Sequence, residues 1–134
     1  MINLSEIGRD AKLASKELAF FSSQKKKIAL QCMAENLIKE EIFILNENSI
    51  DLKRAEKEGK EKAFLDRLAL NKKRIKTMAE GLLDVVALPD PVGVVKEKIK
   101  RPNGLYIQKK TVPLGVIGII YEARPNVTVD VAGL

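Results

Sequence analysis

The sequence predicts an α/β fold, in which N-terminal helices are followed by a β-hairpin and the first strand of a sheet. Apolar residues recur every three or four positions through much of residues 5–88, the period of helices that bury one face. After Pro91 the pattern changes to two short runs around the turn Arg101-Pro-Asn-Gly104. The β-branched run Val116–Ile120 has almost no polar side, which is typical of a strand buried on both faces of a parallel sheet.

Residues 5–21 carry the pattern of an amphipathic helix. Its apolar face comprises Ile7, Ala11, Ala14, Leu18 and Phe21. A second helix is expected to begin at Ser23, whose hydroxyl can accept a free backbone N–H as an N-cap. Its buried face comprises Leu30, Met33, Leu37 and Ile44. This helix either continues past Asn46 or is interrupted by the polar cluster at residues 46–49.

Further helix boundaries are marked by single residues. Gly59 lies in a very polar stretch and marks the end of a helix. Asn71 is expected to cap the next helix, whose apolar face comprises Ile75, Met78, Leu82 and Val85. The sequence Pro89-Asp-Pro91 ends that helix, because proline lacks the N–H that helices need and restricts the residue before it.

The C-terminal part of the sequence predicts strands. Residues 94–99 and 105–112 form the two strands of the hairpin, and a new helix begins near Val127. A buried parallel strand needs a neighbour, and the crossover helix after it needs a sheet to cover. The pattern therefore predicts the front part of a longer α/β protein.

Composition excludes several classes of protein. The 134 residues have a net charge of +6, with 46% apolar and 31% charged residues, the balance of one soluble globular domain rather than a disordered tail. The single cysteine, Cys32, excludes an internal disulfide, and without histidine the usual zinc ligand sets are lacking. No run approaches the ~20 apolar residues of a membrane span, and the first residues lack a signal-peptide pattern. We expect a cytoplasmic protein.

The positive charge is concentrated in the predicted hairpin. Its basic residues are Lys96, Lys98, Lys100, Arg101, Lys109 and Lys110, against the single acidic residue Glu97. Such a block can attract the phosphates of nucleic acid or of a dinucleotide. It is also the solvated face expected of a hairpin whose lysines protect an edge strand from aggregation. Only Tyr106 offers a stacking aromatic ring within the block, which favours the second interpretation.

The stretch from Val112 to Asp130 closely resembles the gamma-glutamyl phosphate reductase family, within the aldehyde dehydrogenase superfamily. The segment Pro113-Leu-Gly-Val-Ile-Gly118 alone would indicate only the superfamily. The motif Glu122-Ala-Arg-Pro-Asn126 narrows the resemblance to the reductase family. Similar segments occur upstream at Ala87–Gly93, Arg101–Gly104 and Leu65–Leu68. By this resemblance the chain is the N-terminal portion of such a reductase, ending in a truncated aldehyde-dehydrogenase-like cofactor domain.

The resemblance implies a function and a division of the chain. Members reduce L-glutamyl 5-phosphate to L-glutamate 5-semialdehyde with NADPH, releasing phosphate, in proline biosynthesis. Residues 1–93 would be the helical part of the cofactor-binding domain, 94–112 a hairpin of the oligomerisation region, and 113–134 the first strand and helix start of the NADP-binding sheet. A homo-oligomer is then expected. The alternatives are a naturally short, noncatalytic association module and, less favoured, a basic nucleic-acid-binding domain.

The same resemblance names candidate site residues. The family's nucleophilic cysteine lies beyond this stretch, so Cys32, with no basic motif beside it, is expected to be a core or boundary residue. The backbone at Ile120, Tyr121 and Glu122 would lie near the nicotinamide ribose and pyrophosphate. Asn126 is either a donor to the substrate oxyanion or a helix N-cap. Arg124 either binds a phosphate or carboxylate through its planar fork or is simply exposed.

Overall fold

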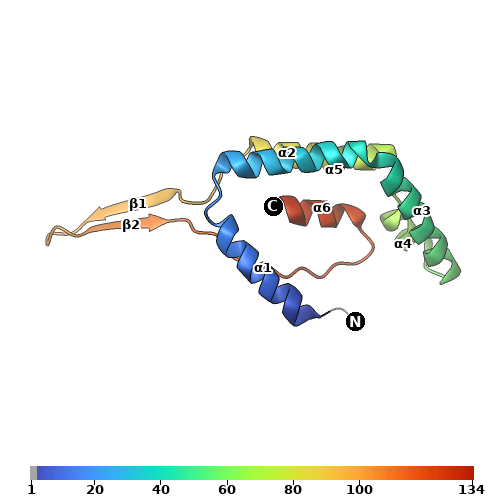
Figure 1. The fold of residues 1–134 in the computed structure, drawn as a ribbon, viewed down its shortest axis with the longest axis horizontal. Coiled ribbons are helices and arrows are strands. Elements are labelled where there is room, and N and C mark those ends of the chain that lie inside the picture. The colour runs from blue at the N-terminus through green and yellow to red at the C-terminus, as the bar shows by residue number, and fades with distance from the viewer. Residues whose placement is uncertain (1–2) are drawn as a thin grey trace. The chain divides into compact units, whose positions relative to one another are not determined.

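Six helices and one two-stranded antiparallel sheet form the described part of the chain, residues 3–134 of a computed structural model, which confirms the predicted α/β class (Figure 1). The elements are α1 (Leu4–Leu18), α2 (Ser23–Lys39), α3 (Glu41–Lys57), α4 (Lys62–Leu68), α5 (Lys72–Ala87), β1 (Val95–Lys100), β2 (Tyr106–Lys110) and α6 (Pro125–Gly133). They fall into two units. One holds the chain up to Ser23 together with Pro89–Gly118, and the other holds Gln24–Leu88 and Ile119–Leu134.

The first unit contains α1 and the hairpin. Asn3 caps α1 by accepting a hydrogen bond from the Glu6 amide at 3.3 Å, and the helix ends at Leu18, earlier than its apolar pattern predicts. No residue of α1 is buried, so the predicted apolar face stays open within the described residues. The Ser23 hydroxyl donates to the Asp90 carboxylate at 2.9 Å. The start of α2 at Ser23 is confirmed, but the N-cap role predicted for this hydroxyl is wrong.

The predicted hairpin is confirmed. β1 and β2 pair in antiparallel register, with Ile99 opposite Ile107, and the ladder is irregular between Val95 and Glu97. At the turn, the Gly104 amide donates to the Arg101 carbonyl at 3.0 Å. Gly104 has φ +86°, a left-handed conformation that glycine adopts without strain. The side chains at residues 101–110 are all exposed.

The second unit is organised around α2, α5 and α6. Its core contains the buried residues Ala34, Ala79 and Leu82, against which Leu30, Met33, Leu37 and Val129 pack. Ile75 and Met78 of α5 are also buried. At the end of α6, a methyl group added to Gly133 would lie 2.6 Å from Leu82 Cδ2, so glycine permits this close approach. The periodicity of residues 71–88 therefore predicted the central helix of this unit.

Two boundaries around α3 differ from the expectation. The second predicted helix breaks at Glu40, and α3 then continues through the polar cluster at 46–49 without interruption. The cluster does not break the helix because the Asn48 side chain bonds outside it, to the Leu68 carbonyl at 2.9 Å and the Leu70 amide at 2.7 Å. The end of α3 was predicted correctly. Gly59 has φ +72° after Lys57, and its amide donates to Glu56.

The strand predicted over Val116–Ile120 is wrong for the structure as described. Residues 111–122 belong to neither a helix nor a strand. Ile117 is 62% exposed and Ile120 is fully exposed. A strand exists only through hydrogen bonds to a neighbouring strand, and no segment within residues 3–134 pairs with this one. The apolar, β-branched composition of residues 116–120 favours a strand, but within residues 3–134 this segment has no strand to pair with.

Candidate functional site

The predicted site residues lie together on the connection that enters α6, within the second unit. Ile120 is fully exposed and Tyr121 is about half exposed. Glu122 and Arg124 follow and are also exposed, and α6 begins at Pro125. Residues 120–122 are therefore exposed, while the helix that follows is anchored to the core through Val129.

Ala123 has φ +56°, a left-handed conformation that non-glycine residues rarely adopt. Such a residue persists only where its surroundings hold it, and the strain costs of order 1–3 kcal/mol. Positions of this kind cluster at binding and catalytic sites. Ala123 lies between Glu122 and Arg124, so the strained residue coincides with the candidate site that the sequence motif indicates.

Arg124 is the residue before the first turn of α6. Its backbone is extended (φ −125°, ψ 94°), it occupies the N-cap position, and its side chain makes no capping bond. Within residues 3–134 its guanidinium has no ion-pair partner. An exposed guanidinium beside a helix N-terminus, where unpaired backbone N–H groups carry partial positive charge, is a suitable arrangement for an anion.

Asn126 lies inside α6, so its predicted N-cap role is wrong. The cap position belongs to Arg124, because Pro125 occupies the first helical position, where its fixed φ and missing N–H are tolerated. The Asn126 side-chain amide donates to the Asp130 carboxylate at 3.1 Å, one turn further along α6. This bond fixes which end of the amide faces Asp130 and leaves the second hydrogen of Nδ2 free to donate.

Thr128 is a residue that the sequence interpretation missed. Its hydroxyl lies 2.6 Å from the Tyr121 hydroxyl, so a hydrogen bond joins the end of the extended segment to the second turn of α6. The only signal in the sequence was that a threonine stands at a polar position among valines, which does not reveal a partner seven residues away.

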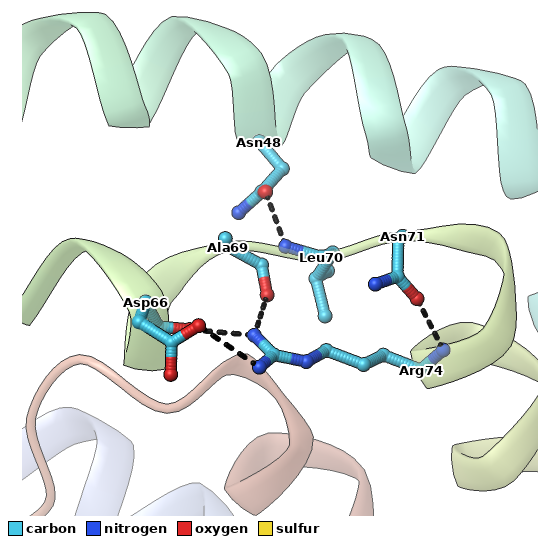
Figure 2. Close-up of polar contacts among 6 residues, drawn as sticks. All are labelled: Asn48, Asp66, Ala69, Leu70, Asn71 and Arg74. Atoms are coloured by element: carbon cyan, nitrogen blue, oxygen red, sulfur yellow. Dashed lines mark hydrogen bonds and ion pairs between the residues drawn. The ribbon is translucent and has the colours of Figure 1, made fainter. Parts of the chain in front are cut away.

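A second polar cluster lies away from the predicted site, at the connection between α4 and α5. Figure 2 shows Asn48 reaching from α3 to the backbone of Leu70, and Arg74 turning back toward Asp66 and Ala69. Asn71 caps α5, as predicted, by accepting from the Arg74 amide at 2.8 Å. Every hydrogen bond of this cluster joins two parts of the second unit, so its role is to hold the connection in place.

Cys32 is exposed on α2, so the prediction that it lies in the core or at its boundary is wrong. It faces away from the buried Ala34, which lies two residues along the helix and about 200° around its axis. No three His, Cys, Asp or Glu residues gather to hold a metal ion in the described chain. Nor is any helix of residues 3–134 long and apolar enough to cross a membrane.

Two surface hollows lie on other parts of the second unit. A hollow of about 590 Å³ is lined by Ile38, Glu41, Lys72, Lys73, Lys76, Ala79, Glu80 and Leu83. Another, of about 310 Å³, is lined by Ile50, Lys53, Arg54 and Lys57. None of the predicted site residues borders either hollow, and the Lys72 and Glu41 side chains already form an ion pair at 3.4 Å across the larger one.

Comparison with known proteins places the chain. It is 56% identical to the gamma-glutamyl phosphate reductase of Heliobacterium modesticaldum over 137 residues, which cover all of this chain and 33% of that protein. It is 57% identical to the reductase of Clostridium beijerinckii over 95% of this chain and 31% of that protein. The chain is homologous to gamma-glutamyl phosphate reductase. It spans about a third of the length of these relatives, and no protein-family model matches it.

Solved gamma-glutamyl phosphate reductases share the fold. The crystal structure of the Thermotoga maritima enzyme matches 99% of this chain with a TM-score of 0.96 and 40% identity, over 32% of its own length. The Saccharomyces cerevisiae enzyme matches 99% of this chain with a TM-score of 0.92 and 31% identity, over 34% of its length. The family resemblance inferred from the Glu122–Asn126 motif is therefore confirmed by both sequence and structure.

Proposed function

We propose that this chain forms part of an NADPH-dependent reductase that converts L-glutamyl 5-phosphate into L-glutamate 5-semialdehyde and phosphate, in proline biosynthesis. The observation that carries the proposal is the 50–57% identity to proteins named gamma-glutamyl phosphate reductase across 94–100% of the chain. In this proposal the chain's share of the reaction is binding and positioning, because these are the roles that the family resemblance implies for residues 120–126.

The described residues suit a ligand that carries phosphate. Arg124 offers an unpaired, planar guanidinium beside the N-terminus of α6, and Ile120, Tyr121 and Glu122 are exposed next to it. NADPH, when bound, supplies the hydride. In this proposal the backbone of residues 120–122 contacts the cofactor and Arg124 binds the phosphate or carboxylate of the substrate.

Asn126 is the proposed donor to the oxygen that becomes negative as the acyl group is attacked. One hydrogen of its amide nitrogen is bound by Asp130, which holds the amide in a single orientation, and the other is free for the oxyanion. The thiolate that attacks the acyl phosphate belongs to a part of the enzyme outside this chain. Cys32 lies on α2 and is not part of the candidate site on the connection into α6.

A hybrid enzyme tests this proposal. The matching third of the Heliobacterium modesticaldum reductase is replaced by this chain, and NADP⁺ reduction is followed with glutamate 5-semialdehyde and phosphate, the reaction in reverse. We expect phosphate-dependent activity. Arg124→Gln should lower kcat/KM by roughly 10- to 100-fold, as expected for the loss of a charge-assisted hydrogen bond, whereas the control Cys32→Ser should leave it unchanged. A folded but inactive hybrid would contradict the proposal.

We also propose that the hairpin of residues 94–112 takes part in subunit association and that the enzyme is a homo-oligomer. β1 and β2 pair only with each other among the described residues, which leaves the outer edge of each strand without a partner. The exposed apolar residues 116–120 add to this tendency. Light scattering of the chain at increasing concentration should show association, and a single monomeric species throughout would contradict the proposal.

A further inference from the structure

The connection into α6 is bridged by a contact that the proposed function does not use. The hydroxyls of Tyr121 and Thr128 lie 2.6 Å apart, although the residues are seven positions apart in the chain. Between them lie Glu122 and Arg124, which are proposed to face the ligand, and the left-handed Ala123. The hydroxyl pair therefore closes a loop around the residues of the candidate site.

We propose that Thr128 is a positioning residue, which acts through Tyr121 to hold the peptide groups of residues 122–124 in their ligand-binding conformation. The identity of the ligand rests on the proposed function above. The effect of Thr128 on the conformation of the loop does not rest on that function, because it follows from the contact between the two hydroxyls alone.

The strain at Ala123 supports this role. Alanine adopts a left-handed conformation only where neighbouring structure imposes it. Two hydrogen bonds lie close to this residue: the Val127 amide donates to the Arg124 carbonyl at 3.0 Å, and the Tyr121 and Thr128 hydroxyls are paired. The first is ordinary for the first turn of a helix, and it begins after Ala123. The second encloses Ala123, so it is the bond that restrains it.

Thr128 can restrain the loop because the helix that carries it, α6, packs against the core at two places. The neighbouring residue Val129 packs against the core cluster of the second unit, and Gly133 approaches Leu82 closely. The threonine hydroxyl is therefore carried on a fixed helix, while Tyr121 belongs to a segment without secondary structure. The hydrogen bond between the two hydroxyls therefore restrains the conformation of the loop relative to the helix.

Two substitutions separate the hydroxyl from the shape of the side chain. Thr128→Val keeps the shape and removes the hydroxyl, whereas Thr128→Ser keeps the hydroxyl and removes the methyl group. Amide hydrogen exchange is measured at Val127, whose amide donates to the Arg124 carbonyl at 3.0 Å and is therefore protected only while that peptide group is held in place. We expect exchange about five-fold faster in Thr128→Val, equivalent to one neutral hydrogen bond, and unchanged in Thr128→Ser. Tyr121→Phe should match Thr128→Val, and the double variant should be no faster than either.

Tyr106→Phe, on the exposed hairpin, is the matched control and should leave the exchange of the Val127 amide unchanged. In the hybrid reductase, Thr128→Val should raise KM for the nucleotide about five-fold, with a smaller change in kcat. Unchanged exchange in Thr128→Val, or equal loosening in Thr128→Ser, would overturn the positioning role whether or not the hybrid is active. An inactive unmodified hybrid would instead overturn the proposed function, and the exchange data would still decide the role of Thr128.

Discussion

Asn48 is the buried polar side chain of the second unit, among the residues that the structure describes. It is 6% exposed and bonds two backbone groups of the α4–α5 connection, the Leu68 carbonyl at 2.9 Å and the Leu70 amide at 2.7 Å. We predict that Asn48→Ala destabilises the protein by about 2–3 kcal/mol. The two hydrogen bonds contribute about 1 kcal/mol each, and leaving partly buried backbone groups without a partner adds to the loss.

Urea unfolding followed by circular dichroism measures the effect. With a denaturant dependence of about 1–3 kcal/mol per molar urea, the midpoint should fall by roughly 1–2 M. Asn46→Ala is the matched control, because Asn46 is an exposed asparagine two residues away on the same helix, and it should shift the midpoint by a few tenths of a molar or less. Asn48→Asp keeps the acceptor for Leu70 but places a carboxylate against the Leu68 carbonyl, so it should also destabilise. Equal midpoints for Asn48→Ala and Asn46→Ala would refute the reasoning.

Three further substitutions test other parts of the structure. Gly133→Ala should destabilise the packing of α6 by about 1–2 kcal/mol, since the added methyl would meet Leu82 Cδ2 at 2.6 Å. Amide exchange across α6 should become faster, whereas the control Gly8→Ala should leave that exchange unchanged. Ala123→Val should lower the free energy of unfolding by about 1–2 kcal/mol, because a β-branched residue tolerates φ +56° less well than alanine. Thermal unfolding measures this, and an unchanged melting temperature would argue against the left-handed conformation. Arg74→Lys should lower the free energy of unfolding in urea by about 1 kcal/mol, since the guanidinium donates to both the Asp66 and Ala69 carbonyls and lysine cannot form that pair of bonds. The control Lys73→Arg should leave the free energy of unfolding unchanged.

Features that depend on neighbours in the chain were predictable. The Asn71 cap, the helix end before Gly59 and the turn at Arg101–Gly104 each involve bonds between residues five or fewer positions apart. The buried face of α5 follows equally from the spacing of Ile75, Met78 and Leu82. The family that the Glu122–Asn126 motif indicated is confirmed by the identity of the whole chain to its members and by the shared fold.

Features that depend on distant partners were not predictable from spacing. The polar cluster at 46–49 has the composition of a helix break, yet α3 continues through it because Asn48 finds partners at Leu68 and Leu70. Ser23 has the composition of a cap, yet its hydroxyl donates to Asp90. Both residue types form side-chain hydrogen bonds readily, and which partner they choose depends on what the fold brings near them.

The sequence by itself indicated the family and the positions of most helices, because these follow from motif, local periodicity and capping. The candidate site around Glu122–Asn126 is a prediction from the same motif. The tertiary structure decided that Arg124, rather than Asn126, precedes α6, that Tyr121 bonds Thr128, and that residues 116–120 stay exposed without a strand partner. The physical reason is the same in each case. A residue's propensity is a property of its own chemistry, whereas a hydrogen bond or a buried face also requires a partner, and only the folded chain supplies or withholds it.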